Sequence, residues 1–178
     1  MIKVLQAIRT GDQNTIEICL RKFPSLLETM KKPMLRLLSE LVVHDRRDYH
    51  LVGWSHGRLT KGLIYQGVPD DQLTGQETDG CQDGRRIYLG ASAAQSATLQ
   101  ALDAFFGVKH APEIHKFLVC MRAYMIRPHR HFIEDLERHS TLRDYVNQSG
   151  SGELRDAYND CISGLEKFRR DHIHIVHR

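Results

Sequence analysis

The sequence predicts an all-α protein, a single helical bundle over residues 1–178 with one long irregular region at about residues 49–90. Two observations support this prediction. Outside that region, apolar residues recur every three or four positions, which is the period of helices with one buried face. Inside it, eight glycines and Pro69 interrupt the pattern, which is typical of loops.

The N-terminal part contains three predicted helices: residues 2–10, from Asp12 to about Phe23, and from Ser25 to about Val43. Gly11 ends the first helix, and Asp12 is a candidate cap of the second. Pro24 is expected to break the chain, after which Ser25 caps the third helix. Pro33 lies inside that helix and predicts a kink or a new start.

The irregular region contains two short segments with extended character, residues 63–65 and 86–88. Between them, residues 70–85 are strongly polar. Loops of this length in compact domains are usually functional or disordered. We therefore expect residues 70–85 to be a mobile loop, either a lid or a disordered insertion.

The C-terminal half predicts five further helices, over about residues 92–107, 112–128, 129–138, 142–146 and 152–178. Ser92 and Ser140 are candidate caps, and Pro112 is suited to a first turn. Ala93 and Ala94 open their helix with small side chains. Small residues there allow a ligand, favourably an anion, to approach the backbone closely, or simply allow tight helix packing.

The last helix has the most informative pattern. Its apolar stripe consists of Leu154, Tyr158, Cys161, Leu165, Phe168, Ile175 and Val176. The same spacing places His172 at a position where the stripe calls for an apolar residue. One interpretation is a core histidine with satisfied ring nitrogens. The other is a metal or heme ligand, since burial favours the neutral imidazole and heme needs one histidine in an apolar slot.

Composition excludes several classes of protein. Hydrophobic residues make up 41% and charged residues 26%, which is ordinary for a globular domain. No apolar run is long enough for a membrane span, and the N-terminus lacks a signal peptide pattern. A net charge of +3, without a basic stripe, argues against nucleic acid. The four scattered cysteines indicate reduced thiols, so we expect a cytoplasmic protein.

Other pairs of polar residues are weaker candidates. His129 and His131 are two residues apart, so on a helix they point in different directions. His174 and His177 have a spacing that allows a shared metal, but the sequence offers no obvious third ligand. Asp103 lies among apolar residues and needs a cationic partner if it is buried. Arg169, one turn before His172, is a candidate partner, and the alternative is that Asp103 faces solvent.

Several motifs occur together in a specific order: GW (53–54), GLIYQGV (62–68), GASAAQS (90–96), MRAYM (121–125), PHRHF (128–132), LRDYV (142–146), LRDAY (154–158) and HIHIV (172–176). In this order and spacing, residues 47–178 resemble the C-terminal part of the indoleamine 2,3-dioxygenase family. The resemblance implies an all-helical fold that binds heme b. It also implies that ferrous heme and dioxygen open the C2–C3 bond of an indole, converting tryptophan into N-formylkynurenine.

The resemblance also assigns roles to individual residues. It places the proximal iron ligand at His172, in agreement with the stripe argument. It places the arginine that meets a heme propionate at Arg169, and the aspartate paired with that arginine at Asp103. The segment beside the heme falls on residues 90–94, including Ser92 and Ala93, with Ala94 in place of a family glycine.

The sequence departs from the family pattern in three respects. Members are about twice as long, so we expect the distal pocket and the loop that closes over substrate to lie outside this chain. In the family, the arginine that binds the substrate carboxylate lies five residues before the glycine of the GW motif, and in this sequence that position is Asp48. Arg47 takes that role only if one extra residue lies between Asp48 and Val52. The stretch at 70–85 is also longer than expected.

These observations leave four functions open. The first is a heme dioxygenase acting on tryptophan or a related indole, completed by another chain or by the rest of a longer protein. The second is a heme-binding protein without dioxygenase activity, and the third is a related heme enzyme of indole metabolism with different chemistry. The fourth is a helical interaction module in which His172 is structural. A chain lacking part of its fold should expose an apolar face, so we expect self-association or a complementary partner chain.

Overall fold

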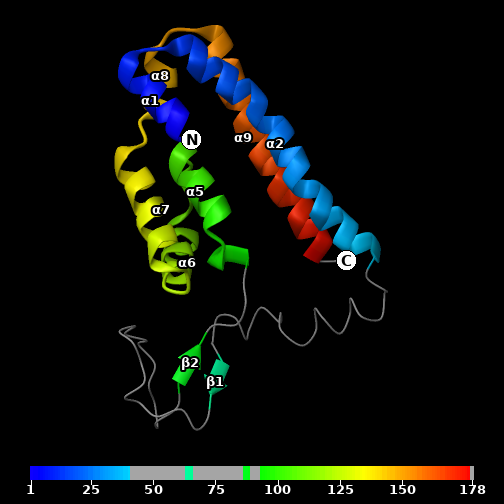
Figure 1. Cartoon of the computed structure of the whole chain (residues 1–178). Helices are drawn as coiled ribbons and strands as arrows, with labels where there is room; N and C mark the ends of the chain where they lie inside the picture. Colours follow the sequence, from blue (N-terminus) through cyan, green and yellow to red (C-terminus); the bar gives the residue numbers. More distant parts are fainter. Residues whose placement is uncertain (41–62, 66–85, 89–92, 177–178) are drawn as a thin grey trace.

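The computed structural model describes residues 1–40, 63–65, 86–88 and 93–176 (Figure 1). Its elements are α1 (Ile2–Thr10), α2 (Gln13–Glu40), β1 (Leu63–Tyr65), β2 (Arg86–Tyr88), the 3-10 turn η2 (Ala93–Gln95), α5 (Ala97–Phe106), α6 (Pro112–Arg122), α7 (Arg127–His139), α8 (Leu142–Gln148) and α9 (Gly152–Val176). Helices dominate, which confirms the predicted all-α class. The predicted mobile loop at 70–85 lies outside the described residues.

The two strands are a small exception within the helical fold. β1 and β2 pair antiparallel, with Leu63 opposite Tyr88 and Tyr65 opposite Arg86. They coincide with the two extended segments that the sequence predicted. β-branched and aromatic side chains favour such short pairs.

The local sequence explains where α1 ends and where α2 begins. Gly11 adopts a left-handed conformation, with φ of 69°, and ends α1 as predicted. The side chain of Asp12 accepts a hydrogen bond from the Thr15 amide at 3.0 Å, as a cap does. α2 then continues as one helix, in which Pro24 and Pro33 are interior residues.

The prediction of a break at Pro24 was therefore wrong, and so was the prediction that Ser25 caps a new helix. Ser25 instead donates a hydrogen bond to the Lys22 carbonyl at 2.8 Å. The reason is packing, because the apolar stripe continues in register across the proline. Leu20 before Pro24 and Leu27 after it are 1% and 3% exposed. Burial of both residues against the same neighbour outweighs the loss of one backbone hydrogen bond.

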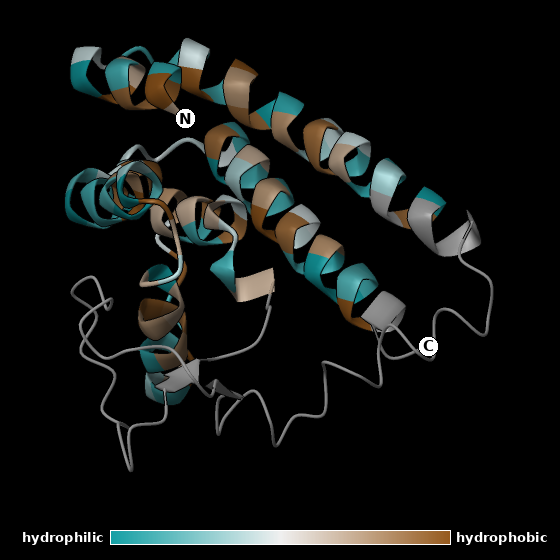
Figure 2. Ribbon diagram, turned by 60° about the horizontal axis from the view of Figure 1, so that its bottom comes forward, coloured by the Kyte–Doolittle hydropathy of each residue, from teal (hydrophilic) through white to brown (hydrophobic). Residues whose placement is uncertain are grey.

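That neighbour is α9, which runs parallel to α2 along its length (Figure 1). The predicted stripe of α9 is buried from Leu154 to Leu165, which are 0% and 1% exposed. Cys161 donates a weak hydrogen bond to the Leu20 carbonyl at 3.2 Å. Burial raises the pKa of its thiol to about 12, so this cysteine packs as an inert apolar residue. Figure 2 shows hydrophobic and hydrophilic residues alternating along both long helices.

An aromatic cluster joins this helix pair to α5. The ring of Phe106 lies edge-to-face against Phe23, Phe105 and Tyr158, with centroids 4.8, 4.9 and 5.9 Å apart. The Tyr158 hydroxyl donates to the Phe106 carbonyl at 2.5 Å. These contacts bring α2, α5 and α9 together, and so determine which face of α5 meets α9.

Two predicted caps are corrected by the structure. α5 begins after Ser96, whose hydroxyl accepts from the Thr98 amide, while Ser92 lies outside the described residues. α8 begins after Thr141 rather than at Ser140. Ser140 ends α7 and donates to the Phe105 carbonyl at 2.6 Å, because a neighbouring helix offers it a partner that the sequence does not reveal.

The apolar period of the α6 sequence predicts one buried face that includes Ile114, Phe117 and Met121, and this prediction holds only in part. Met121 is 1% exposed. Ile114 and Phe117, however, are 52% and 37% exposed. The physical reason is that α6 contacts the rest of the molecule mainly through its C-terminal turn and through η2. An apolar period alone therefore located the helix but did not establish what covers it.

Candidate functional site

His172 lies near the end of α9, one turn beyond Phe168 and Arg169. Its side chain is partly buried. Burial holds the pKa of the imidazole below its ordinary value, which favours the neutral form. A neutral ring nitrogen is the form of histidine that ligates metals. The neighbouring stripe residues Ile175 and Val176 belong to α9, but their side chains are not among those described.

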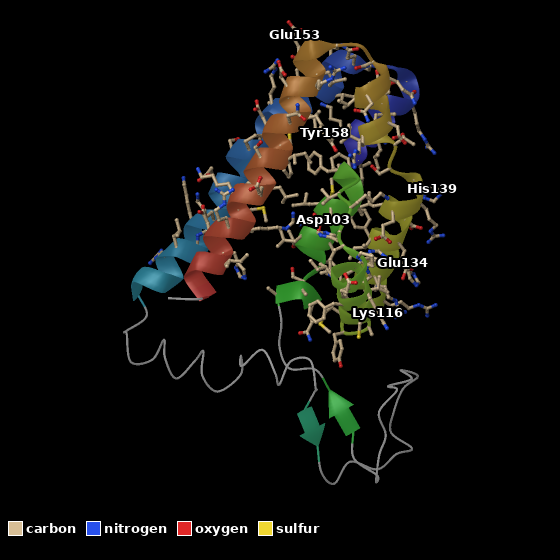
Figure 3. The ribbon with its side chains drawn as sticks, turned by 180° about the vertical axis from the view of Figure 1, so that it is seen from behind. Asp103, Lys116, Glu134, His139, Glu153 and Tyr158 are labelled. Atoms are coloured by element: carbon tan, nitrogen blue, oxygen red, sulfur yellow. The ribbon has the colours of Figure 1, made fainter. Side chains whose placement is uncertain are left out.

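Arg169 and Asp103 form an ion pair between α9 and α5. The Asp103 side chain is 10% exposed and that of Arg169 is 29% exposed. In Figure 3, Asp103 lies on the side of α5 that faces α9. A carboxylate buried among apolar residues needs such a partner. The structure therefore brings together the two residues that the sequence suggested as partners, although they are 66 positions apart.

Asp103 has a second partner that the sequence interpretation missed. Nε2 of His110 lies 2.9 Å from Oδ2 of Asp103, within hydrogen-bonding distance. Gly107 ends α5 in a left-handed conformation, and the Val108 amide donates to the Asp103 carbonyl at 2.9 Å. This turn folds the chain back and brings His110 to the carboxylate. The glycine after the helix was the available signal, but it did not indicate which side chain would return.

Lys31 is a second missed residue, on the opposite side of α9. Its ammonium group lies 2.7 Å from Glu28 and 2.9 Å from Asp171, and its side chain is 12% exposed. The contact ties the turn of α9 that carries His172 to α2. Both carboxylates raise the pKa of Lys31, so the amine stays charged.

The remaining predicted residues are only partly placed. Ala93 belongs to η2 and its side chain is exposed. Ser92 and Arg47 lie outside the described residues. A cavity of about 560 Å³ adjoins Asp103 and His110 between α5, α6, α7 and α8. Among the described residues, neither His172 nor Arg169 lines this cavity, although Asp103, the partner of Arg169, does.

The histidine pairs give no metal centre in the described part of the chain. His129 and His131 are exposed on α7. The side chain of His174 and residue 177 are not described. Among the described residues, no group of three histidine, cysteine or acidic side chains is placed to hold a metal ion. A search of the same residues found no helix with the length and apolarity of a membrane span.

Comparison with known proteins extends the family resemblance over the whole chain. A family model described as Indoleamine 2,3-dioxygenase matches residues 1–178. Indoleamine 2,3-dioxygenase 2 of Mus musculus is 32% identical over all of this chain and 42% of its own length. Indoleamine 2,3-dioxygenase 2 of Homo sapiens is 39% identical over 71% of this chain and 28% of its own length. A protein named myoglobin from Haliotis madaka is 32% identical over 66% of this chain.

The chain thus spans less than half of the length of these curated relatives. The match also includes residues 1–46, upstream of the first motif that resembled the family. Complete coverage by the family model, with relatives at this level of identity, agrees with the helical architecture. The chain therefore belongs to the indoleamine 2,3-dioxygenase family, a family of heme-dependent dioxygenases.

Proposed function

We propose that this chain contributes the proximal side of a heme dioxygenase that opens the C2–C3 bond of tryptophan or a related indole. One observation carries the proposal. A half-buried histidine that favours its neutral form lies one turn from an arginine anchored by a buried aspartate. In this proposal His172 binds the iron of heme b, and Arg169 donates to a propionate.

The chemistry of these side chains fits heme. A single neutral imidazole on a largely apolar helix face is sufficient for proximal ligation. Nη2 of Arg169 contacts Asp103, and the side chain remains 29% exposed, so the guanidinium can donate to a second carboxylate. The small, exposed side chain of Ala93 allows a flat ligand to approach η2. Ser92 beside the heme and Arg47 at the substrate carboxylate complete the proposal from family resemblance.

Bound heme would supply the reaction with dioxygen, and the chain's residues would position the reactants. The Asp103 carboxylate orients Arg169 and balances its charge. The ion pair of Lys31 with Asp171 holds the turn of α9 that carries His172 against α2. Arg47 would hold the tryptophan carboxylate, and dioxygen would be the second substrate.

The first test is a visible spectrum of the purified chain reconstituted with hemin, in the ferric state and after reduction with dithionite under carbon monoxide. We expect a Soret band and a ferrous–CO form typical of histidine ligation. His172→Ala should remove both while circular dichroism shows that the helices persist. His131→Ala, an exposed histidine on α7, is the matched control and should retain the spectrum. Stoichiometric heme in His172→Ala would refute this ligand.

A tryptophan turnover assay then tests the activity, with N-formylkynurenine as the product. Heme binding without turnover would favour the second candidate, a heme-binding protein without dioxygenase activity. The relative from Haliotis madaka supports this alternative, because its name, myoglobin, is that of a heme protein rather than an oxygenase. Absence of a specific Soret band would refute both and leave a helical interaction protein.

We also infer self-association or a complementary chain. Ile114, Phe117, Ile126 and Phe132 on or next to α6 and α7 are between 37% and 62% exposed. Burial of such residues stabilises an interface in proportion to the apolar area removed from water. Light scattering of the purified chain tests the inference, and a monomer at all concentrations would contradict self-association.

A further inference from the structure

Gln100 is a buried amide on α5 with every hydrogen-bonding group of its side chain in use. It is 4% exposed. Its Nε2 donates to the Ala94 carbonyl at 2.7 Å and to the Leu118 carbonyl at 3.1 Å. Its Oε1 accepts from Nε of Arg122 at 2.8 Å. One side chain therefore ties η2 to α5 and α6, directly beside Ala93.

Arg122 determines which way this amide points. It is 7% exposed, and its two terminal nitrogens donate to both carboxylate oxygens of Glu137, at 2.8 and 2.5 Å. This forked contact fixes the plane of the guanidinium, so that Nε is aimed at Gln100. The same contact lowers the pKa of the Glu137 carboxyl, which keeps the pair charged.

The partners of the Gln100 side chain exclude the orientation in which its amide oxygen and nitrogen exchange places. If the amide turned over, its oxygen would face two carbonyl oxygens and its N–H groups would face a guanidinium. The three hydrogen bonds of the amide would then be lost in a buried place, and each such loss is unfavourable. Glu137 orients Arg122, Arg122 orients Gln100, and Gln100 holds the Ala94 carbonyl. The Ser96 amide donates to the Ala93 carbonyl at 3.0 Å and closes the same turn.

We propose that Gln100 and Arg122 are positioning residues that hold the Ala93–Gln95 turn in the shape required to contact a bound heme. The inference rests on the proposed function for the identity of the ligand. The network has no member on α9, so it would be a second support, built separately from the α9 contacts that carry His172. These residues position the turn and take no part in catalysis, because Gln100 contacts only its backbone while Arg122 and Glu137 reach it through Gln100.

Gln100→Glu is the sharpest test, because the substitution keeps size and shape and still accepts from Arg122. It replaces two donated hydrogen bonds with two carbonyl–carboxylate repulsions. Arg122→Lys reaches the same turn from the other end of the network and serves if Gln100→Glu does not fold. Ile133→Val is the matched control, a core truncation on α7 at a residue that is 0% exposed and outside the network.

Two readouts are measured on each variant. The first is hydrogen–deuterium exchange of the peptide covering residues 93–96 in the heme-free chain. The second is the rate of heme loss to an excess of apomyoglobin. In Gln100→Glu we expect faster exchange and heme loss about tenfold faster, the equivalent of one to two hydrogen bonds. Ile133→Val should lower the unfolding midpoint in urea and leave both rates unchanged.

The outcomes separate this inference from the proposed function. Unchanged exchange at 93–96 in both network variants would overturn the positioning role. The positioning role would also be overturned if the rate of heme loss rose in proportion to the loss of global stability, to the same degree in Gln100→Glu and Ile133→Val. A third outcome is that the network variants exchange faster at 93–96 but the unsubstituted chain binds no heme. This result would support the positioning of the turn and reject heme as its ligand.

Discussion

The two halves of α9 differ in what holds them. From Leu154 to Leu165 the inward side chains are apolar and almost fully buried against α2. From Glu166 onward, Phe168 still packs against the core, and ion pairs join it, including those of Arg169 with Asp103 and of Asp171 with Lys31. The first half stabilises the fold by burial, which is non-directional. The second half orients particular side chains, which requires directional contacts.

This difference shows how one helix can serve stability and function separately. Substitutions in the first half should change the free energy of unfolding and leave the candidate site intact in the folded fraction. Substitutions in the second half should change the site more than the stability. The following predictions test this separation.

The largest expected effect is that of Leu165→Ala, at a residue that is 1% exposed. The lost methyl groups and the remaining cavity should lower the free energy of unfolding by about 3 kcal/mol. Urea unfolding followed by circular dichroism measures this change. Glu166→Ala, at the next and exposed position, is the control and should change stability by less than about 0.5 kcal/mol. Equal effects at both positions would contradict the assignment of the core.

Asp103→Ala should cost less stability and affect the site more. The substitution leaves Arg169 and His110 without their shared carboxylate, at a cost of about 1–3 kcal/mol. We expect Asp103→Ala to lose heme faster than Leu165→Ala when the two variants are compared at the same folded fraction. Transfer of heme to apomyoglobin measures the rate. A rate of heme loss equal to that of the unsubstituted chain would argue against a role of this pair in the site.

Lys31→Met should have a smaller effect than Asp103→Ala, because Glu28 and Asp171 are partly exposed. Urea unfolding in low and in high salt provides the measurement. The difference from the unsubstituted chain should shrink as salt screens the ion pairs. Lys167→Met is the control, since its side chain is 62% exposed and lies 3.4 Å from Glu28. A larger loss in the control would show that the contact with Asp171 does not hold the end of α9.

The smallest expected effect is on the stability of the folded state at acidic pH. Arg122 holds the pKa of Glu137 below its ordinary value of 4.5, so the pair stabilises the folded state above that pH. Stability should fall as the pH drops below about 4.5 and the folded carboxyl takes up a proton. Glu137→Gln should therefore show a shallower loss between neutral and acidic pH. An identical acid profile in the variant would show that other carboxyls dominate the transition.

The prediction of elements from the sequence was most accurate where local chemistry decides the structure. Gly11 ended α1, Asp12 supplied a cap, and residues 63–65 and 86–88 formed the two strands. The stripe of α9 was correct through Leu165. In each case the responsible interactions lie within a few residues of one another, or repeat with the helical period, and both properties are visible in a linear sequence.

Tertiary packing decided what local preferences could not. Pro24 should end a helix, but burial on both sides of it against α9 carried α2 through the proline. Ser140 had the sequence of a cap, yet Phe105 lies 35 positions away and supplies its partner. The face of α6 had a helical apolar period, yet no described neighbour covers Ile114.

For the candidate site, the sequence by itself determined the position of His172 on a helical stripe and the need of Asp103 for a cation. The structure decided that Arg169 meets that need, that His110 shares the carboxylate, and that Gln100 and Arg122 are buried together. The physical reason is distance along the chain. Helical period reports which residues share a face, whereas only the packing of separate helices decides which buried polar groups find each other.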